Sequence, residues 1–388
     1  MLITTTPSSS AVAEGDLMEG AQDMTTEEFA IRSSSAGIGA AYSCDEFSPL
    51  REVIVGNPYG ARIPRQDVSA WLNLYGDLSR SEMERVLTGE FPARVIEETA
   101  EDLEVLVSTL RGLGVVVHQA LASDQAQEFG TPQWRTDGFY NYCPRDLTLI
   151  IGDMIIETAS PMRARYFELF SMRHLFQRFM LNGSTWIAAP RPQLADELFL
   201  IDEQDRPVLG EQEPVFEAAN VLRCGKDLFY QVSASGNELG RIWLERTLQA
   251  YGDFTIHPLR KIYEYTHIDS TIAFLRPGLV LLNPERINDT NLPDVLRKWD
   301  AIWCPSMNTE PTASPYPLSS RWIGMNLLMV SPELAVVDAA QHELIRALER
   351  NGIDTIPLTL RHARTLGGGF HCVTLDVLRD GTMESYFD

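Results

Sequence analysis

The sequence predicts an α/β fold in which a hairpin-and-helix unit recurs about five times around a centre. Two observations predict it. In several places a short apolar run, a tight-turn signal and a second apolar run follow one another, which is the pattern of a β-hairpin. Amphipathic helical segments separate these places. A mixed α/β sandwich would produce much the same hydropathy, so the radial arrangement depends on the repetition alone.

The predicted elements can be followed along the chain. The expected hairpins span residues 147–157, 221–232, 271–282 and 326–337, with Gly or Pro in most of their turns. REVIVG, from Arg51, and FHCVTLDVL, from Phe370, have the character of the first and last strands of the same set. Helices are expected at 95–113, 166–180, 239–251 and 342–350, because apolar residues recur there at helical spacing.

The first 40 residues differ in composition from the rest. They are rich in Ser, Thr, Ala and Gly, and they carry six acidic residues against Arg32 alone. Because few large apolar side chains are available for burial, residues 1–40 are expected to form a disordered or loosely attached acidic tail. No linker composition interrupts the remainder, so residues 41–388 are expected to form a single catalytic domain.

Charge and cysteine content exclude several classes of protein. The 388 residues carry 32 Lys and Arg against 54 Asp and Glu, a net charge of −22. A nucleic acid or an anionic membrane surface requires a basic face, whereas a cationic small molecule suits this balance. Five cysteines with no CxxC pair argue against a disulfide framework or a four-cysteine zinc site. With no signal peptide or membrane span in view, a soluble, reduced, cytoplasmic protein is expected.

Polar residues stand at the start of successive hairpins. If the units are radial, these positions converge at one end of the central axis and form a pocket of carboxylates, hydroxyls and an imidazole. Each acid taken alone would more ordinarily be a solvated loop residue, and it is the repetition that favours a site. The residues are Asp146, Glu217, His267, Asp269, Ser319 and Ser320.

Cys372 is a candidate nucleophile. It follows three consecutive glycines, which permit a close backbone approach or a positive φ, and a strand edge there could expose it to a pocket. Burial as a small apolar residue is the commoner fate of a free cysteine. His371 is a poor base for this thiol because adjacent strand residues point to opposite faces. His267 is the better candidate, since Asp269 would share its strand face. No metal-ligand spacing and no phosphate-binding loop is present, so neither a metal nor a cofactor is expected.

Long segments of the chain resemble the arginine amidinotransferase family, which includes glycine and inosamine-phosphate amidinotransferases. The resemblance runs from about residue 45 to 388 and is densest in five segments: PRDLTLIIGDMIIE, PMRARYFE, HIDSTIAFLRPGLVLLNPER, SSRWIGMNLLM and RHARTLGGGFHCVTLDV. It implies an α/β propeller, pentein-like, with five-fold pseudosymmetric ββαβ modules. It also implies a homodimer.

The resemblance assigns roles to residues. Cys372 in GGGFHC corresponds to the family's nucleophile, and His267 in HID to its catalytic histidine. Glu217 stands where the family's third catalytic residue is usually an Asp, in a motif that here reads FEAA. Asp146 and Asp269 correspond to the acids that bind the guanidinium of the substrate; Arg286, Ser319 and Ser320 correspond to residues that bind the donor amino acid. Residues 263–266 differ from the loop of the glycine-using enzymes, which argues against glycine as acceptor.

The implied activity is amidino transfer. L-arginine would give its amidino group to Cys372, ornithine would leave, and a primary amine would accept the group in a ping-pong reaction. Antibiotic or toxin biosynthesis is the expected setting. One alternative is a hydrolase of the same superfamily, in which water replaces the amine and citrulline forms. The other is a non-catalytic arginine-binding protein that lost activity through the change to Glu217.

Overall fold

Five three-stranded β-sheets dominate the computed structural model, which describes residues 39–309, 312 and 315–387. In each sheet two strands pair antiparallel, and the third runs parallel to the second of them. A parallel neighbour requires a crossover connection, which is usually a helix. Each sheet is therefore one ββαβ module, and the predicted repetition of hairpin and helix is confirmed.

The strands of the five sheets have the following bounds: β1 (Leu50–Val55), β4 (Val116–Gln119) and β21 (Thr374–Arg379); β7 (Thr148–Ile151), β8 (Met154–Glu157) and β9 (Thr185–Ala188); β12 (Val221–Cys224), β13 (Asp227–Gln231) and β14 (Thr255–Leu259); β15 (Ile272–Arg276), β16 (Leu279–Leu282) and β17 (Asp300–Trp303); β18 (Leu328–Ser331), β19 (Leu334–Asp338) and β20 (Asp354–Leu358). Shorter pairs are β2 (Arg62–Ile63) with β3 (Gly89–Glu90), β5 (Phe129–Gly130) with β6 (Arg135–Thr136), and β10 (Phe199–Ile201) with β11 (Pro207–Leu209).

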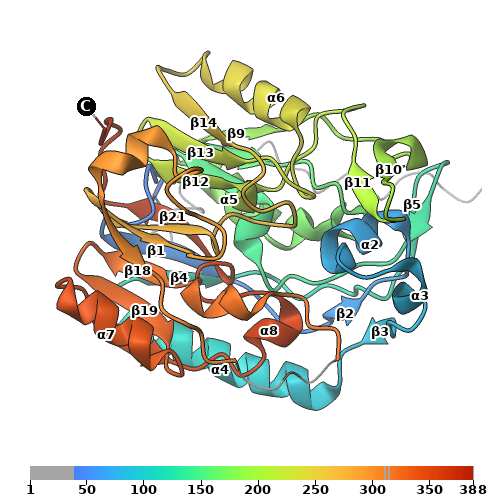
Figure 1. Cartoon of the computed structure of the whole chain (residues 1–388), viewed down its shortest axis with the longest axis horizontal. Helices are drawn as coiled ribbons and strands as arrows, with labels where there is room; N and C mark the ends of the chain where they lie inside the picture. Colours follow the sequence, from blue (N-terminus) through green and yellow to red (C-terminus); the bar gives the residue numbers. More distant parts are fainter. Residues whose placement is uncertain (1–38, 310–311, 313–314, 388) are drawn as a thin grey trace, which may run out of the picture. The chain divides into compact units, whose positions relative to one another are not determined.

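One sheet joins segments from opposite ends of the chain. β21 pairs antiparallel with β1, with Val53 opposite Asp376 and Val55 opposite Thr374. Figure 1 shows the blue β1 and the red β21 lying together. This pairing completes the fifth module, so the first and last strands belong to one set, as the sequence predicts. Cys372 lies two residues before β21 and is therefore positioned by this closure.

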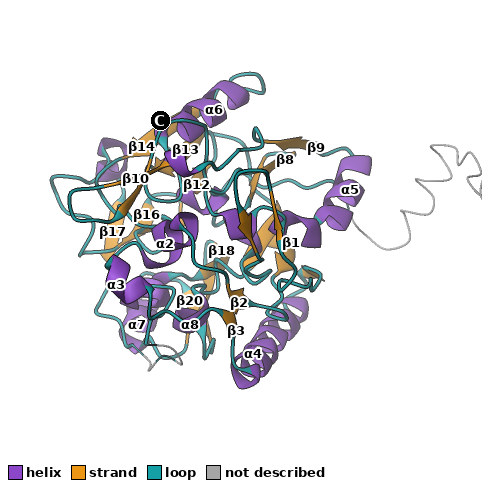
Figure 2. Ribbon diagram, turned by 90° about the vertical axis from the view of Figure 1, so that its right-hand side faces the viewer, coloured by secondary structure: helices purple, strands orange, loops and turns teal. Residues whose placement is uncertain are grey.

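The crossover helices lie outside the strands in Figure 2. They are α4 (Ala93–Gly112), α5 (Arg173–Leu181), α6 (Glu238–Leu248) and α7 (His342–Arg350). In the sheet of β15–β17 a short 3₁₀ helix, Asp294–Lys298, takes the place of the α-helix. The helix expected at 166–180 begins late, because 3₁₀ helices occupy Arg163–Arg165 and Glu168–Ser171. Arg165 and Glu168 turn inward there and pair with each other at 2.7 Å.

Three further helices are α2 (Val68–Tyr75), α3 (Arg80–Met83) and α8 (Ala363–Leu366). Every residue of β8, β12, β13 and β16 is buried, and most of these residues are apolar, as expected for strands covered on both faces. Among the described residues, no helix has the length and apolar character needed to cross a bilayer. All five cysteines are free and buried. The tail predicted at residues 1–40 lies outside the described residues except for its last two, and the single domain at 41–388 stays a prediction.

Candidate active site

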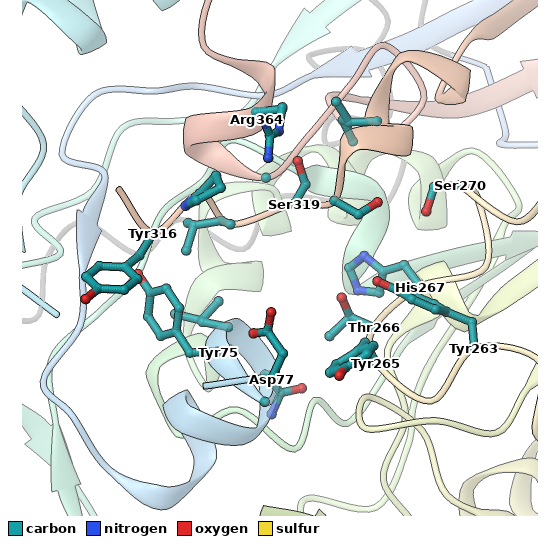
Figure 3. Close-up of a pocket in the computed structure, with 18 of the residues that line it drawn as sticks. Tyr75, Asp77, Tyr263, Tyr265, Thr266, His267, Ser270, Tyr316, Ser319 and Arg364 are labelled. Carbon is teal, nitrogen blue, oxygen red and sulfur yellow. The ribbon is translucent and has the colours of Figure 1, made fainter. Parts of the chain in front are cut away.

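A cavity of about 430 Å³ brings together four separate segments of the chain. They are residues 73–78 at the end of α2 and just beyond it, 263–270 before β15, 315–323 before β18, and the stretch from α8 to β21, which contributes Arg364, Gly367 and Cys372. Figure 3 shows Tyr263, Tyr265 and His267 on one side of this cavity, with Tyr75 and Tyr316 on the other. The volume lies within the range of ~300–1,000 Å³ found for small-molecule sites.

The candidate residues occupy equivalent places in the five modules. Except for Arg286, each lies in the connection that leads into the first strand of a sheet; Ser319 and Ser320 lie farthest from their strand, since the 3₁₀ helix Arg321–Met325 comes between them and β18. Asp146 precedes β7, Glu217 precedes β12, His267 and Asp269 precede β15, Ser319 and Ser320 precede β18, and Cys372 precedes β21. Because the modules repeat the same connection, these side chains are delivered to one region, and the contacts below join members of four modules.

Glu217, His267 and Asp146 form one cluster, in which the two carboxylates are buried and His267 is partly exposed. His267 Nε2 lies 2.5 Å from Glu217 Oε2, and Ser160 donates to the other oxygen of Glu217 at 2.6 Å. Arg165 Nη1 donates to Asp146 Oδ2 at 2.9 Å and to Glu217 Oε2 at 3.2 Å. The remaining oxygen of Asp146, Oδ1, is buried without a hydrogen-bond partner and lies 3.8 Å from His267 Nδ1.

The charges of this cluster shift its protonation. Burial alone would lower the pKa of His267, but Asp146, Cys372 and Glu217 outweigh it and raise that pKa well above its ordinary value. Burial would raise the pKa of Glu217, but Arg165 and His267 hold it at about 2. Burial raises the pKa of Asp146. His267 is therefore an imidazolium at neutral pH, beside an ionised Glu217.

Cys372 is buried and held by two side chains. Its Sγ donates to Asp269 Oδ2 at 3.1 Å and accepts from Asn326 Nδ2 at 3.2 Å, while Asn326 Oδ1 accepts from the backbone N–H of Cys372 at 3.0 Å. A contact with Cys143, burial and the carboxylate of Asp269 raise the pKa of Cys372 well above its ordinary value, and His267 opposes them. These surroundings favour the thiol form of Cys372 over the thiolate.

Two predictions from the sequence assumed that His267 with Asp269, and His371 with Cys372, lie in strands, and this assumption is wrong. Residues 267–270 form a turn before β15, so His267 and Asp269 do not share a strand face, and His267 has a φ of 51°. His371 and Cys372 likewise precede β21. They do not point apart: His371 Nδ1 lies 3.1 Å from the same Asp269 oxygen that accepts from Cys372. Alternation of side chains holds only within a strand, and both pairs lie in turns.

Each of the three glycines before Cys372 is required for a different structural reason. Gly367 adopts a φ of +83° at the end of α8. A Cβ on Gly368 would lie 2.4 Å from Cys143 Sγ, and one on Gly369 would lie 2.7 Å from Asn326. The close approach is therefore to the protein's own side chains around the thiol.

The residues expected to bind the donor amino acid do not all line the cavity. Ser319 and Ser320 line the cavity. Arg286 does not: its guanidinium lies 3.4 Å from the centre of the Tyr263 ring and donates to Ser320 Oγ at 3.0 Å and Ser270 Oγ at 2.8 Å. Burial lowers the pKa of Arg286. It supports the cavity wall from behind in this structure.

Sequence reasoning missed two residues of the site. Arg165 holds both carboxylates of the His267 cluster, and Asn326 contacts Cys372 through both its oxygen and its nitrogen. The available signal was their place in the segments PMRARYFE and SSRWIGMNLLM. The spacing of Asp146, Glu217 and His267 would also accommodate a metal ion. The Arg165 guanidinium already supplies a positive charge there, so these residues suit proton transfer better.

Solved structures of hydrolases share the fold. A dimethylarginine dimethylaminohydrolase aligns with a TM-score of 0.54 over 84% of this chain and 99% of its own, at 14% identity. At this identity the likeness concerns the fold alone. No family model matches the chain.

Much stronger similarity exists to amidinotransferases. Inosamine-phosphate amidinotransferase 1 of Streptomyces glaucescens is 48% identical over 342 residues, which cover 88% of this chain and 97% of the relative. The solved inosamine-phosphate amidinotransferase of Streptomyces griseus aligns with a TM-score of 0.86 at 48% identity, covering 90% of this chain and 100% of that one. An amidinotransferase of the saxitoxin pathway of Microseira wollei gives 0.82 at 35% identity, covering 89% and 99%. The chain therefore belongs to the arginine amidinotransferase family.

Proposed function

We propose that this protein transfers the amidino group of L-arginine to a primary amine through a covalent amidino-Cys372 intermediate and releases ornithine. The observation that carries the proposal is the set of unsatisfied or ionised acids around a buried thiol. Asp146 Oδ1 has no partner, and Asp269 lies 3.1 Å from Cys372 Sγ. A planar guanidinium cation complements such a set, because it offers several N–H donors in one plane.

The first half of the reaction forms the amidino-enzyme. The thiol proton leaves to solvent as the guanidinium cation binds, since the cation offsets the charge of Asp269 beside Cys372. The thiolate attacks the guanidinium carbon and forms an S–C bond. His267, held as an imidazolium by Glu217 and Asp146, gives its proton to the nitrogen that carries the amino-acid chain. The C–N bond breaks and ornithine leaves.

The second half reverses these events with a different amine. The acceptor nitrogen attacks the amidino carbon, and the now neutral His267 takes a proton from it. The S–C bond breaks, which restores the Cys372 thiolate and the His267 imidazolium. Glu217 positions the imidazole through its 2.5 Å contact. Arg165 fixes Glu217 and Asp146 relative to each other.

We further propose that the acceptor is a phosphorylated aminocyclitol amine and that the reaction belongs to antibiotic or toxin biosynthesis. Three relatives at 47–49% identity are named inosamine-phosphate amidinotransferases. The cytoplasmic location and the homodimeric state remain predictions.

Isotope-labelled arginine tests the proposal. Incubation with labelled arginine and a panel of amines, inosamine phosphate among them, should give ornithine and a labelled guanidino product. Citrulline and ammonia in place of these would assign the chain to the hydrolase alternative. Tight arginine binding with no turnover would indicate a non-catalytic binding protein.

A further inference from the structure

Arg364 differs from the other arginines of the site because its guanidinium has no hydrogen bond or ion pair with any residue that the structure describes. It lies in α8, is half-buried and lines the cavity. Its Nε is buried without a hydrogen-bond partner, and no carboxylate of the described residues pairs with it. Arg165, by contrast, donates to three carboxylates, and Arg286 donates to hydroxyl and carbonyl oxygens.

A second unsatisfied donor lies beside Arg364. The hydroxyl of Ser319 is buried, lines the same cavity and has no hydrogen-bond partner. The backbone N–H of Leu318 donates to the carbonyl of Arg364 at 3.0 Å, which keeps the two segments together. Figure 3 shows Ser319 next to Arg364 at one wall of the cavity, with Asp77 and Tyr265 on the opposite side. Buried donors are almost always satisfied, so two adjacent ones indicate a ligand rich in acceptor oxygens.

The charge of the ligand follows from its surroundings. Among the described residues that line the cavity, the basic ones are His267 and Arg364, and the acidic ones are Asp77 and Asp269. In a chain of net charge −22, an anionic ligand needs a fixed cation to hold it. A guanidinium with free N–H groups binds the oxygens of phosphate or carboxylate in a bidentate manner.

We propose that Arg364 forms the subsite for the anionic group of the acceptor, a phosphate, and so sets acceptor specificity. The Ser319 hydroxyl, which the family resemblance assigns to the donor amino acid, serves the acceptor in the second half-reaction, because the two substrates of a ping-pong reaction occupy one cavity in turn. This inference rests on the proposed function, because it needs a second substrate in the same cavity. The α-carboxylate of arginine is the other source of such an oxyanion. The two half-reactions separate the two sources, since arginine enters only the first and the acceptor only the second.

The test compares wild type with Arg364→Gln and Arg364→Lys. Inorganic phosphate binding is measured by calorimetry, amidination of Cys372 by arginine is followed by intact mass, and transfer is followed with inosamine phosphate and unphosphorylated inosamine. Arg364→Gln should weaken phosphate binding and the use of inosamine phosphate by about tenfold to a hundredfold, the usual loss for a charge-assisted hydrogen bond. Amidination and the use of inosamine should stay unchanged. Arg364→Lys, which keeps the charge without the fork, should be intermediate.

Arg350→Gln, at the exposed end of α7, is the matched control and should behave as wild type. Equal phosphate binding by wild type and Arg364→Gln would overturn the inference. Slower amidination at low arginine would also overturn it, because Arg364 would then serve the donor. The calorimetric result stands even if wild type forms no amidino-enzyme, an outcome that would instead count against the proposed function.

Discussion

Two buried groups of charged side chains lie close together in this protein, and they differ in how completely their polar atoms are satisfied. The first, the Asp376 cluster, consists of Glu46, Arg145, Arg223, Asp376 and Arg379. The second, the reaction cluster, consists of Asp146, Glu217, His267, Asp269 and Cys372. Arg223 illustrates the first: its guanidinium donates to Glu46, Asp376, Ser43 and a backbone carbonyl. In the second, Asp146 keeps an oxygen without any partner.

The pKa values of Asp376 and Asp146, one carboxyl from each cluster, shift in opposite directions. Despite burial, Arg223 and Arg145 hold the pKa of Asp376 well below its ordinary value. Burial raises the pKa of Asp146 instead, because its neighbours do not compensate fully. A fully paired ion cluster contributes to structure, whereas an incompletely paired one keeps binding capacity for a ligand. The two also touch: Arg145 Nε donates to the carbonyl of His371 at 2.8 Å, next to Cys372.

The largest effect on activity is expected at Cys372, in the reaction cluster. Cys372→Ser should abolish turnover and leave the melting temperature unchanged, because the hydroxyl stays protonated where a thiolate is needed. Intact mass of wild type mixed with arginine alone should show an amidino group on Cys372, and the variant should show none. Substantial transferase activity in the variant would remove Cys372 from the mechanism.

Asp376→Asn should produce the opposite pattern. It removes the carboxylate that accepts from three buried arginines, and breaking a buried ion pair typically costs about 3–5 kcal/mol. The free energy of unfolding in urea should fall by that order, while kcat per folded molecule stays near wild type. Asp380→Asn is the control, since its pair with Arg51 is exposed and such pairs contribute about 0–1 kcal/mol. Equal stability of the two variants would contradict the structural role of the Asp376 cluster.

Glu217 tests whether the reaction cluster is adjusted to its longer acid. Its carboxylate contacts His267, Ser160 and Arg165 at 2.5–3.2 Å, so the site accommodates Glu. Glu217→Asp would move the carboxylate by about 1 Å, a displacement that can lower kcat on the order of a hundredfold. Glu217→Gln should be worse, because it removes the charge that favours imidazolium at His267. A Gln variant with wild-type kcat would exclude a catalytic role for Glu217.

Asp146→Asn should separate binding from stability. Loss of a charge-assisted hydrogen bond should weaken the use of arginine by about tenfold to a hundredfold. The free energy of unfolding should fall less than in Asp376→Asn, because Arg165 keeps the carboxylates of Glu168 and Glu217 and the Asp146 oxygen Oδ1 has no partner to lose. Asp269→Asn should weaken arginine use similarly. Normal arginine binding by both variants, measured by calorimetry, would mean that these acids are structural.

The fold was largely predictable from local pattern. The hairpins at 147–157 and 221–232 contain strands bounded by glycines at positive φ, Gly152 and Gly225, and apolar spacing located α4 and α7. The start of α5 was not predictable. Arg165 and Glu168 turn inward and pair with each other inside the protein, and the spacing of residues in the sequence does not reveal such a turn.

The site was predictable by its position in the repeat, but its contacts were not. Module starts identified Asp146, Glu217 and His267 because a repeated connection delivers equivalent residues to one place. The assumption that 267–269 and 371–372 are strands failed, since both segments are turns. Arg165, Asn326 and Arg364 lie in segments that resemble the family, but no pattern of neighbouring chemical groups marks these three residues. Their importance depends on which donors are satisfied, and only the folded chain decides that.

The smallest expected effect concerns the ionisation of Cys372. Cys143, burial and the Asp269 carboxylate raise the pKa of this thiol, so Asp269→Asn should lower that pKa by removing one of the three causes. The rate of alkylation by iodoacetamide as a function of pH reports that pKa, since only the thiolate reacts. Wild type should react slowly at neutral pH and faster as the pH rises, and the variant's midpoint should lie at lower pH. Asp77→Asn, which also removes a cavity acid, should leave the midpoint unchanged. In the proposed mechanism, a bound guanidinium offsets the charge of Asp269 and so lowers the pKa of Cys372 in wild type. The Asp269→Asn variant lacks that charge permanently. A midpoint that rises in Asp269→Asn would mean that the carboxylate favours the thiolate, and the arginine-assisted ionisation would then be wrong.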